Sequence, residues 1–249
     1  MSNHKKALLL LGSIATVFSA PMQPSLSLTQ QLLLSESAID RYNLLPNDTQ
    51  FVFDFNAGTP DRGKGGDIVI ANRKTFPALV GTGASMAVGR IGPCGINTLH
   101  VHPRSSELQM VIEGRLVVEM NPENGVLNAN GTRRIIRGEI GPYQMTPFYQ
   151  GSIHTQFNPD CANTMFVASF ASEDFGTEQV IDGSLAFSND IVAATFGQII
   201  SGENIDFVRN SIPANIALGV EQCLRTCGIQ KRSRYKKPLQ RFTPAFHGP

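Results

Sequence analysis

Three histidines and one glutamate lie in two short segments whose spacing suits a metal ion. His100 and His102 are separated by one residue, and Glu107 follows five residues after the second histidine. Side chains of a β-strand alternate between its faces, so His100 and His102 point to the same side. A turn after Pro103 brings Glu107 alongside on the next strand, and His154 adds an imidazole from a second β-like segment. The pattern predicts one metal site formed by His100, His102, Glu107 and His154.

The distribution of histidine supports this prediction. The chain has five histidines, and the other two, His4 and His247, lie near its ends. A single histidine is more often structural than a ligand, but three with a glutamate at this spacing favour a metal. Three imidazoles and a carboxylate leave positions open in an octahedral shell, which suits manganese, iron or nickel. Zinc also accepts four such ligands, so ligand chemistry alone does not choose the ion.

The elements that must position these residues are predominantly β-strands. Short β-rich segments alternate with Gly, Asn, Pro or Asp, and Gly114 permits a hairpin turn after the first metal segment. The expected strands cover 51–55, 67–71, 84–91, 97–102, 107–112, 115–120, 133–136, 152–157 and 164–170, with a loop over 57–66. Many short strands separated by turns predict a mainly β sandwich or barrel.

Helical patterns lie on both sides of the predicted strands. Residues 27–43 have helical spacing, and Ser27 is a suitable N-cap. After about residue 185, helices are expected over 190–199, 203–211 and 213–227. The last carries an apolar stripe of Ile216, Val220 and Cys223, which is typical of a core or subunit contact.

The N-terminus has the features of a signal peptide. A basic start is followed by the apolar stretch 7–18, which is too short to span a bilayer, and by small residues at Ser19 and Ala20. The alternative is a buried helix of a cytosolic protein. We expect a signal peptide over 1–20 and a protein that is secreted, extracellular or wall-associated. The glycosylation sequons at Asn47 and Asn130 agree with export.

Composition limits the class of protein. The chain has 249 residues, 41% hydrophobic and 16% charged, with a net charge of +1, so it can form a core and has no general nucleic-acid character. No later segment is long enough to span a membrane. The expected organisation is an N-terminal extension over 21–50, a barrel over 51–185, a helical region over 186–229 and a basic tail over 230–249. The tail is either solvated or binds a wall or another polyanion.

Four cysteines, an even number, predict two disulfides in an exported protein. Cys94 and Cys161 lie close in sequence to the two metal segments, which favours pairing them and leaves Cys223 to Cys227. On an intact helix, Cβ atoms four residues apart are about 5–6 Å from each other, whereas a disulfide needs about 3.5–4.5 Å. The helix is therefore distorted there or this pairing is wrong, and free buried thiols are the alternative.

The two metal segments resemble the two motifs of the cupin superfamily, especially germin-like proteins and the spherulin-like branch of fungi and slime moulds. The resemblance extends from about residue 51 to 228. It includes Thr75-Phe76-Pro77-Ala78-Leu79, Gly92-Pro93-Cys94-Gly95, Gly151-Ser152-Ile153-His154 and Pro213-Ala214-Asn215. The second motif departs from the family in having Tyr149 where a proline is usual, with Pro147 nearby.

This resemblance implies a double-stranded β-helix, a jelly-roll barrel with an N-terminal helix and C-terminal helices and with the ion inside the barrel mouth. It implies manganese as the ion. It also implies a homo-oligomer, a trimer or hexamer, in which C-terminal helices pack on neighbouring subunits. Plant germins carry an N-terminal disulfide, but this chain has no cysteine before Cys94.

The resemblance also suggests an activity on a small molecule. Some germins oxidise oxalate with manganese and oxygen, and others are credited with superoxide dismutation. Asn97 matches an asparagine that oxalate-oxidising germins use, whereas their second asparagine falls near Ala87, which cannot replace it. Gln109 replaces a small residue, and we expect it to face inward and to narrow or repolarise the pocket. Asn97 and Gln109 are therefore the candidate catalytic residues.

Two other functions agree with the same sequence. Cupins are reused in fungi to tailor secondary metabolites by oxidation, cyclisation or coupling. A non-enzymatic wall or spore protein of the spherulin type, in which the metal merely stiffens the barrel, would also suit an exported chain. Fold alone does not decide among these functions.

Overall fold

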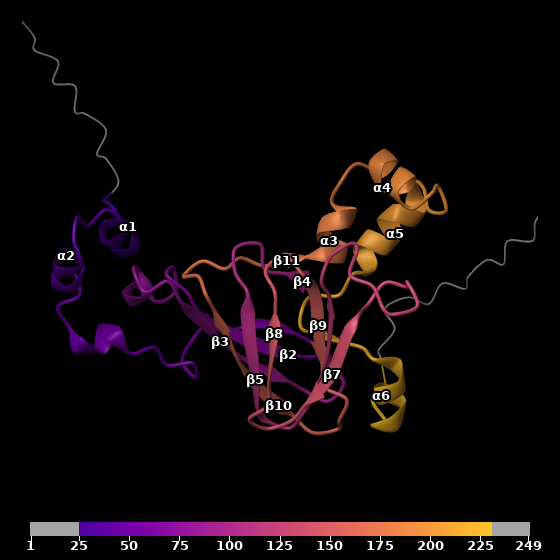
Figure 1. The fold of residues 1–249 in the computed structure, drawn as a ribbon, viewed down its shortest axis with the longest axis horizontal. Helices are drawn as coiled ribbons and strands as arrows, with labels where there is room; N and C mark the ends of the chain where they lie inside the picture. The colour runs from indigo at the N-terminus through magenta and orange to yellow at the C-terminus, as the bar shows by residue number, and fades with distance from the viewer. Residues whose placement is uncertain (1–24, 231–249) are drawn as a thin grey trace, which may run out of the picture.

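The computed structural model describes residues 25–230, so the predicted signal peptide and all but the first residue of the predicted tail lie outside the described residues. Two antiparallel sheets face each other (Figure 1). The first sheet has the order β1 (Asp61–Gly63), β2 (Gly66–Ala71), β3 (Ser85–Ile91), β10 (Thr164–Phe170), β5 (Glu107–Glu113) and β8 (Met145–Phe148). The second has the order β11 (Glu178–Gln179), β4 (Gly95–Val101), β9 (Ile153–Phe157), β6 (Leu116–Asn121) and β7 (Ile136–Ile140), and β12 (Ala217–Leu218) also pairs with β4.

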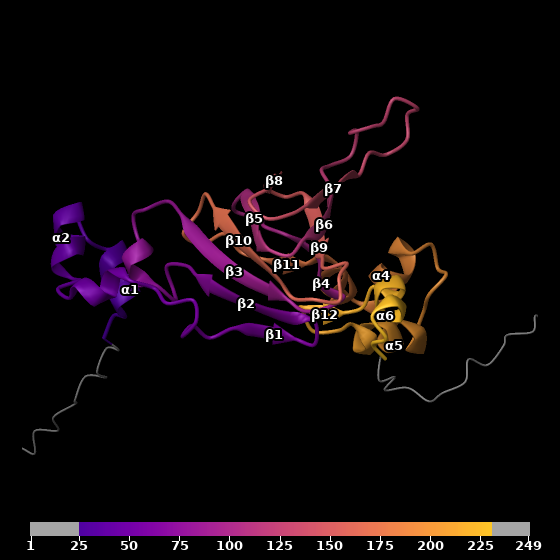
Figure 2. The same cartoon turned by 90° about the horizontal axis from the view of Figure 1, so that it is seen from below.

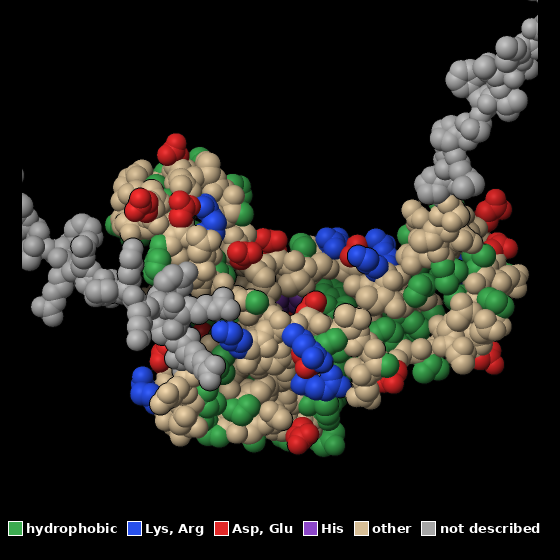
Figure 3. Space-filling view, turned by 180° about the vertical axis from the view of Figure 1, so that it is seen from behind, with side chains coloured by type: hydrophobic (Ala, Val, Ile, Leu, Met, Phe, Trp, Pro, Cys, Tyr) green, Lys and Arg blue, Asp and Glu red, His purple; other side chains and the backbone are tan. Residues whose placement is uncertain are grey.

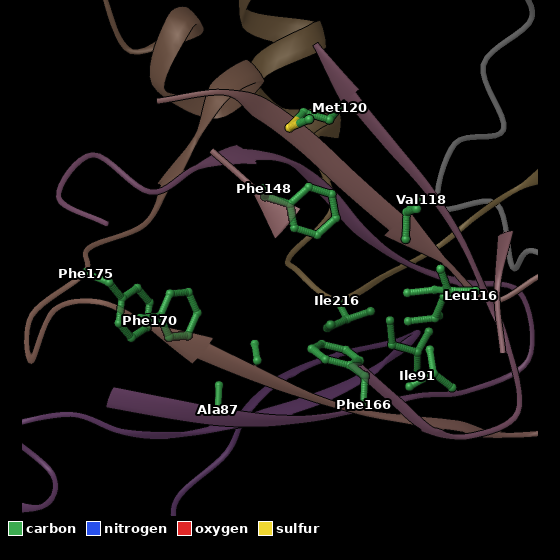
Figure 4. Close-up of a cluster of buried hydrophobic side chains, with 13 residues drawn as sticks. Ala87, Ile91, Leu116, Val118, Met120, Phe148, Phe166, Phe170, Phe175 and Ile216 are labelled. Carbon is green, nitrogen blue, oxygen red and sulfur yellow. The ribbon is translucent and has the colours of Figure 1, made fainter. Parts of the chain in front are cut away.

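The hydrophobic core lies between the two sheets. Burial alternates strictly along β10, as expected for a strand with one face against a core. Figure 4 shows side chains from both sheets meeting in this space, with Phe148, Phe166 and Phe170 among the largest. Gly114 forms the turn between β5 and β6 with φ of 75°, a left-handed conformation that glycine adopts without steric cost. The arrangement confirms the predicted mainly β jelly-roll barrel.

Helices lie at opposite ends of the barrel (Figures 1 and 2). The N-terminal end carries α1 (Leu28–Leu33), α2 (Ala38–Asn43) and the 3-10 helices η1 (Asp48–Phe51) and η2 (Pro77–Leu79). The C-terminal end carries α3 (Val180–Leu185), α4 (Asn189–Thr195), α5 (Glu203–Ser211) and α6 (Glu221–Thr226). No helix among residues 25–230 is long and apolar enough to cross a membrane.

The N-terminal region differs from the sequence prediction in two places. The helix expected over 27–43 is two helices, because the Ser37 hydroxyl accepts a hydrogen bond from the Asp40 amide and so caps a new helix start. The strand expected over 51–55 is absent. Its residues end η1 and enter a turn in which the Asp54 carbonyl accepts from the amides of Ala57 and Gly58. The predicted loop that follows contains β1, which forms a hairpin with β2.

The C-terminal prediction was right for α5 and wrong for the helix over 213–227. Ala217 and Leu218 instead form β12, which pairs with Ile96 and Gly95 of β4, and α6 begins only at Glu221. The edge of β4 offers backbone groups that need partners, and an extended segment satisfies them. Ile216, next to β12, and Cys223, in α6, are both buried, although they do not belong to one helix.

Both disulfides differ from the predicted pairing. The bonds join Cys94 to Cys223 and Cys161 to Cys227, not Cys94 to Cys161 and Cys223 to Cys227. All four cysteines are bridged, as expected. The prediction failed because closeness in sequence to a metal ligand is not closeness in space: Cys94 precedes β4, whereas His100 lies near that strand's other end. Cys94 packs there against Cys223 and Leu224 of α6, so both bridges attach α6 to the barrel.

Candidate metal centre

The four predicted ligands come together from both sheets at one end of the barrel. His100 lies on β4 directly opposite His154 on β9, and Glu107 is the first residue of β5. His102 is the first residue after β4. All four side chains are buried, and one potential ligand atom from each lies within 4.8 Å of the others. In Figure 3, histidine is visible at the bottom of a hollow with charged side chains around its rim.

The outer ring nitrogen of each histidine is held by a backbone carbonyl. The contacts are His100 Nδ1 to Thr98 O at 2.7 Å, His102 Nδ1 to Gly176 O at 2.7 Å and His154 Nδ1 to Ser152 O at 2.9 Å. A carbonyl can only accept, so each Nδ1 carries a hydrogen and donates it. The Nε2 atom of each neutral ring is then the atom that can bind a metal. Metal-binding histidines commonly have such an outer partner, which fixes the tautomer and the ring orientation.

Glu107 supplies the negative charge of the site. Its Oε2 atom lies 2.9 Å from His102 Nε2 and 3.2 Å from His154 Nε2. Because the Nδ1 hydrogens are already donated, these contacts bring lone pairs together unless a positive charge lies among them, either a proton or a metal cation. A single cation among these atoms relieves the repulsion. The donor set therefore fits a metal ion on chemical grounds.

Electrostatics keep two of the ligands in the states that bind a metal. Burial, reinforced by the neighbouring His154, lowers the pKa of His100 to about 3, so this ring is neutral at ordinary pH. Burial alone would raise the pKa of Glu107. In the metal-free protein, a proton held between Glu107 and the two Nε2 atoms provides hydrogen bonds from His102 and His154, and these outweigh burial and lower the pKa of Glu107 to about 2. The carboxylate is therefore ionised.

Aromatic side chains fix the planes of two imidazoles. Phe148 stacks on His154 with ring centroids 4.2 Å apart. Phe170 and Phe175 stack on each other and meet His102 edge-on at 4.9 Å and 5.2 Å. These contacts surround the polar cluster with apolar walls, which restrict the rotation of the rings and the access of water.

A cavity of about 390 Å³ opens beside the four residues. His100, His102 and Glu107 are part of its wall, together with apolar side chains of β2, β3 and β10. The polar residues of the wall are Asn97, Thr177, Gln179 and Asn215, with Asp61 and Arg62 exposed where β1 borders the cavity. A small polar or anionic molecule can therefore reach the ligand atoms.

The two candidate catalytic residues occupy different places. Asn97 lines the cavity, and its Nδ2 atom lies 3.5 Å from His100 Nε2. Ala87 also lines it and offers no polar group. Gln109 is completely buried, as expected for an inward-facing residue, but it is not part of the cavity wall. Both polar atoms of its amide have no hydrogen-bond partner among the described residues.

Sequence reasoning missed two amides at this site. Gln156 lies two residues after His154 on β9, is completely buried and, like Gln109, has no hydrogen-bond partner in residues 25–230. Strand alternation from His154 would have placed it inward. Asn215 contacts Asn97 across a sequence separation of 118 residues; the family resemblance includes Asn215, but no local pattern indicates this contact.

Comparison with known proteins identifies the family. The cupin family model matches residues 55–204, which is more than half of the chain. The chain is a member of the cupin family. This cupin is 33% identical to Spherulin-1A of Physarum polycephalum over 81% of this chain and 79% of that protein. It is 34% identical to Spherulin-1B of the same organism, with coverages of 85% and 83%.

Germins and solved cupin structures agree with this assignment. Germin-like protein subfamily 2 member 3 of Arabidopsis thaliana is 32% identical over 64% of this cupin and 71% of its own length. The chain thus belongs to the germin- and spherulin-like cupins. A recombinant oxalate oxidase in complex with glycolate superimposes with a TM-score of 0.57 at 18% identity, covering 66% of this chain and 81% of that one. At that identity the likeness establishes the fold.

Proposed function

We propose that this cupin is an exported, manganese-dependent oxidoreductase that acts on a small anionic substrate, either oxalate or superoxide. The observation that carries the proposal is the cavity of about 390 Å³, whose wall includes His100, His102 and Glu107. An ion held by these residues would keep coordination positions directed toward a space large enough for a small acid and oxygen. A purely structural metal site is usually closed by protein ligands.

Each residue has a distinct role in this proposal. His100, His102, Glu107 and His154 hold the ion, which when bound supplies a redox centre and a Lewis acid. Asn97 donates a hydrogen bond to the substrate. The apolar wall excludes water from the reacting groups. The nitrogen and oxygen donor set supports manganese without requiring it, and the germin resemblance favours manganese over iron, nickel or zinc.

The proposal includes export and assembly. The two disulfides suit an oxidising compartment, and the sequon residues Asn47 and Asn130 are both exposed. Asn130 belongs to the connection between β6 and β7, which extends away from the barrel (Figure 2). Exposed apolar side chains on the terminal helices support a homo-oligomer. Association with a cell wall is part of the same proposal.

The test is to assay the manganese-loaded protein for hydrogen peroxide release from oxalate and for superoxide dismutation on the same sample. We expect at least one activity in the wild type, and a loss of about tenfold or more in Asn97→Ala with unchanged metal content. Gln109→Gly should change activity much less, because Gln109 is not part of the cavity wall. A fully metal-loaded protein without either activity would contradict the proposal.

The similarity to both spherulins over about four-fifths of this chain favours one rival, a non-enzymatic wall or spore protein. In that case the metal only stiffens the barrel. Folding would then depend on the ion while no redox activity accompanies it. Thermal unfolding of the metal-loaded and metal-free protein, measured beside the two assays, separates this function from the enzymatic one.

A further inference from the structure

A C-terminal segment completes the cavity wall from outside the barrel. Asn215 and Ile216 both line the cavity, and Ile216 is buried in the barrel core. The Ile216 carbonyl accepts from the Gly65 amide at 2.9 Å, and β12 continues along β4. The Cys94–Cys223 bond then fixes the following residues. Asn215 is therefore held firmly beside the metal centre.

A chain of hydrogen bonds sets the orientation of two amides in this wall. The backbone amide of Thr98 lies 2.9 Å from Asn215 Oδ1, and a backbone amide can only donate, so the accepting atom must be oxygen. The other atom of Asn215 is then the Nδ2 donor, which lies 2.6 Å from Asn97. The Asn97 atom that accepts it must be Oδ1. The remaining Asn97 atom, the Nδ2 donor, faces His100 Nε2 at 3.5 Å.

We propose that Asn215 is a positioning residue that presents the Nδ2 donor of Asn97 to a ligand at the metal centre. The site would therefore select a ligand with an acceptor oxygen, such as a carboxylate, over one that must donate there. This inference rests on the proposed binding of a small anion at the metal.

The alternative orientation of Asn97 is disfavoured by the same chain. An isolated asparagine amide can turn over and offer either its oxygen or its nitrogen to the cavity. Turning Asn97 over would place two NH₂ groups against each other at the 2.6 Å contact, with no acceptor between them. Turning both amides would place the Asn215 nitrogen against the Thr98 amide. The unambiguous donor at Thr98 thus fixes the polarity of the cavity wall.

The experiment is a double-mutant cycle on the manganese-loaded full chain, with Asn97→Ala, Asn215→Ala and the double variant. Calorimetry measures the Kd for oxalate, and metal analysis measures manganese content. We expect each single variant to weaken oxalate binding by about tenfold, the usual contribution of one hydrogen bond to a charged group. The double variant should be no weaker than Asn97→Ala, because Asn215 acts through Asn97.

Two further variants keep the test decisive. Asn215→Asp retains an oxygen that accepts from the Thr98 amide, so we expect this variant to fold. It lacks the Nδ2 donor to Asn97, so it should also weaken oxalate binding. Asn210→Asp adds the same charge on the exposed face of α5 and should leave the Kd unchanged.

Three results would overturn the inference. They are additive losses in the cycle, loss of manganese from Asn215→Ala, and a wild type that binds no oxalate. Because the readout is binding, the inference can hold even where the proposed oxidation fails. If oxidation fails but the inference holds, the losses of oxalate affinity in the cycle are non-additive and no oxalate is oxidised.

Discussion

The hydrogens on the outer ring nitrogens decide which histidine atoms can bind a metal. His100 and His154 each donate to the carbonyl two residues earlier in the chain, Thr98 within β4 and Ser152 just before β9, whereas His102 donates to Gly176, 74 residues away. The first two partners follow from local strand geometry. The third depends on how the segment after β10 folds back over the site. A substitution that moves the Gly176 carbonyl should therefore disturb the orientation of His102 before that of His100 or His154.

The low pKa values of His100 and Glu107 predict how stability depends on pH. For His100 the pKa falls from 6.5 in the unfolded chain to about 3, and for Glu107 it falls from 4.5 to about 2. Between these values the unfolded chain binds more protons, so acid favours unfolding. We expect the metal-free protein to lose the stability contributed by His100 as pH falls from about 6.5 to 3, and that contributed by Glu107 as pH falls from about 4.5 to 2, each by at most about 1.4 kcal/mol per pH unit.

Urea unfolding of the metal-free protein at several pH values measures this dependence. The variant His100→Asn removes one of the two groups, so its stability should fall less steeply between pH 6 and 4. An equal slope in the variant and the wild type would mean that His100 does not cause the dependence.

The sequence predicted the set of candidate ligands but not the amides around it. His100, His102 and Glu107 are close in sequence, and strand alternation orders their side chains. Gln156 was predictable by the same alternation. Asn215 was not, because its contact with Asn97 depends on β12 lying along β4 instead of joining a helix.

The helix α6 acts as an anchor for the C-terminal segment. Cys223 in α6 and Cys227 at the C-cap of α6 bind different loops of the barrel, through Cys94–Cys223 and Cys161–Cys227. The first bridge follows shortly after Asn215 and β12. The second lies farther along the chain.

Replacing both cysteines of one bridge with serine tests this asymmetry. Loss of either bridge should cost about 3–5 kcal/mol of stability, the range for loops of this length. Loss of Cys94–Cys223 should weaken oxalate binding to the manganese-loaded protein more than loss of Cys161–Cys227, because Cys94 directly precedes β4, the strand with which β12 pairs. Calorimetry on both double-serine variants measures the difference. Equal oxalate affinity in the two variants would contradict it.

Helices and strands were predicted correctly where apolar and polar residues alternate clearly along a strand, as in β3, β5 and β10. The predictions failed where a short element depends on a distant partner. The strands β11 and β12 have two residues each and exist only because β4 offers an unpaired edge. Cysteine pairing failed for the same reason, because it depends on where α6 packs.

On the scale of the molecule, exposed apolar side chains lie at both ends of the barrel. The N-terminal region before β1 carries Leu34, Ile39, Tyr42 and Val52, and the C-terminal helical region carries Phe187, Ile191, Phe196 and Ile199. Figures 1 and 2 show the two sets of helices at opposite ends of the barrel. Apolar patches at two separate ends favour contact between subunits.

The apolar patches agree with the trimer or hexamer that the germin resemblance implies, and we expect such an assembly in light scattering during size-exclusion chromatography. Ile199→Glu should shift the mass toward the single chain. The matched variant Tyr143→Glu changes a similarly exposed residue on the barrel and should leave the mass unchanged. A monomeric wild type at micromolar concentration would contradict the proposed assembly.

Metal analysis of the protein secreted by its expression host, without added metal, tests the central claim most directly. The wild type should contain one ion per chain, and that ion should be manganese. The variants Glu107→Gln and His154→Ala, if still folded by circular dichroism, should contain less than about a tenth as much. A folded wild type without stoichiometric metal, or variants with full metal content, would contradict a centre formed by His100, His102, Glu107 and His154.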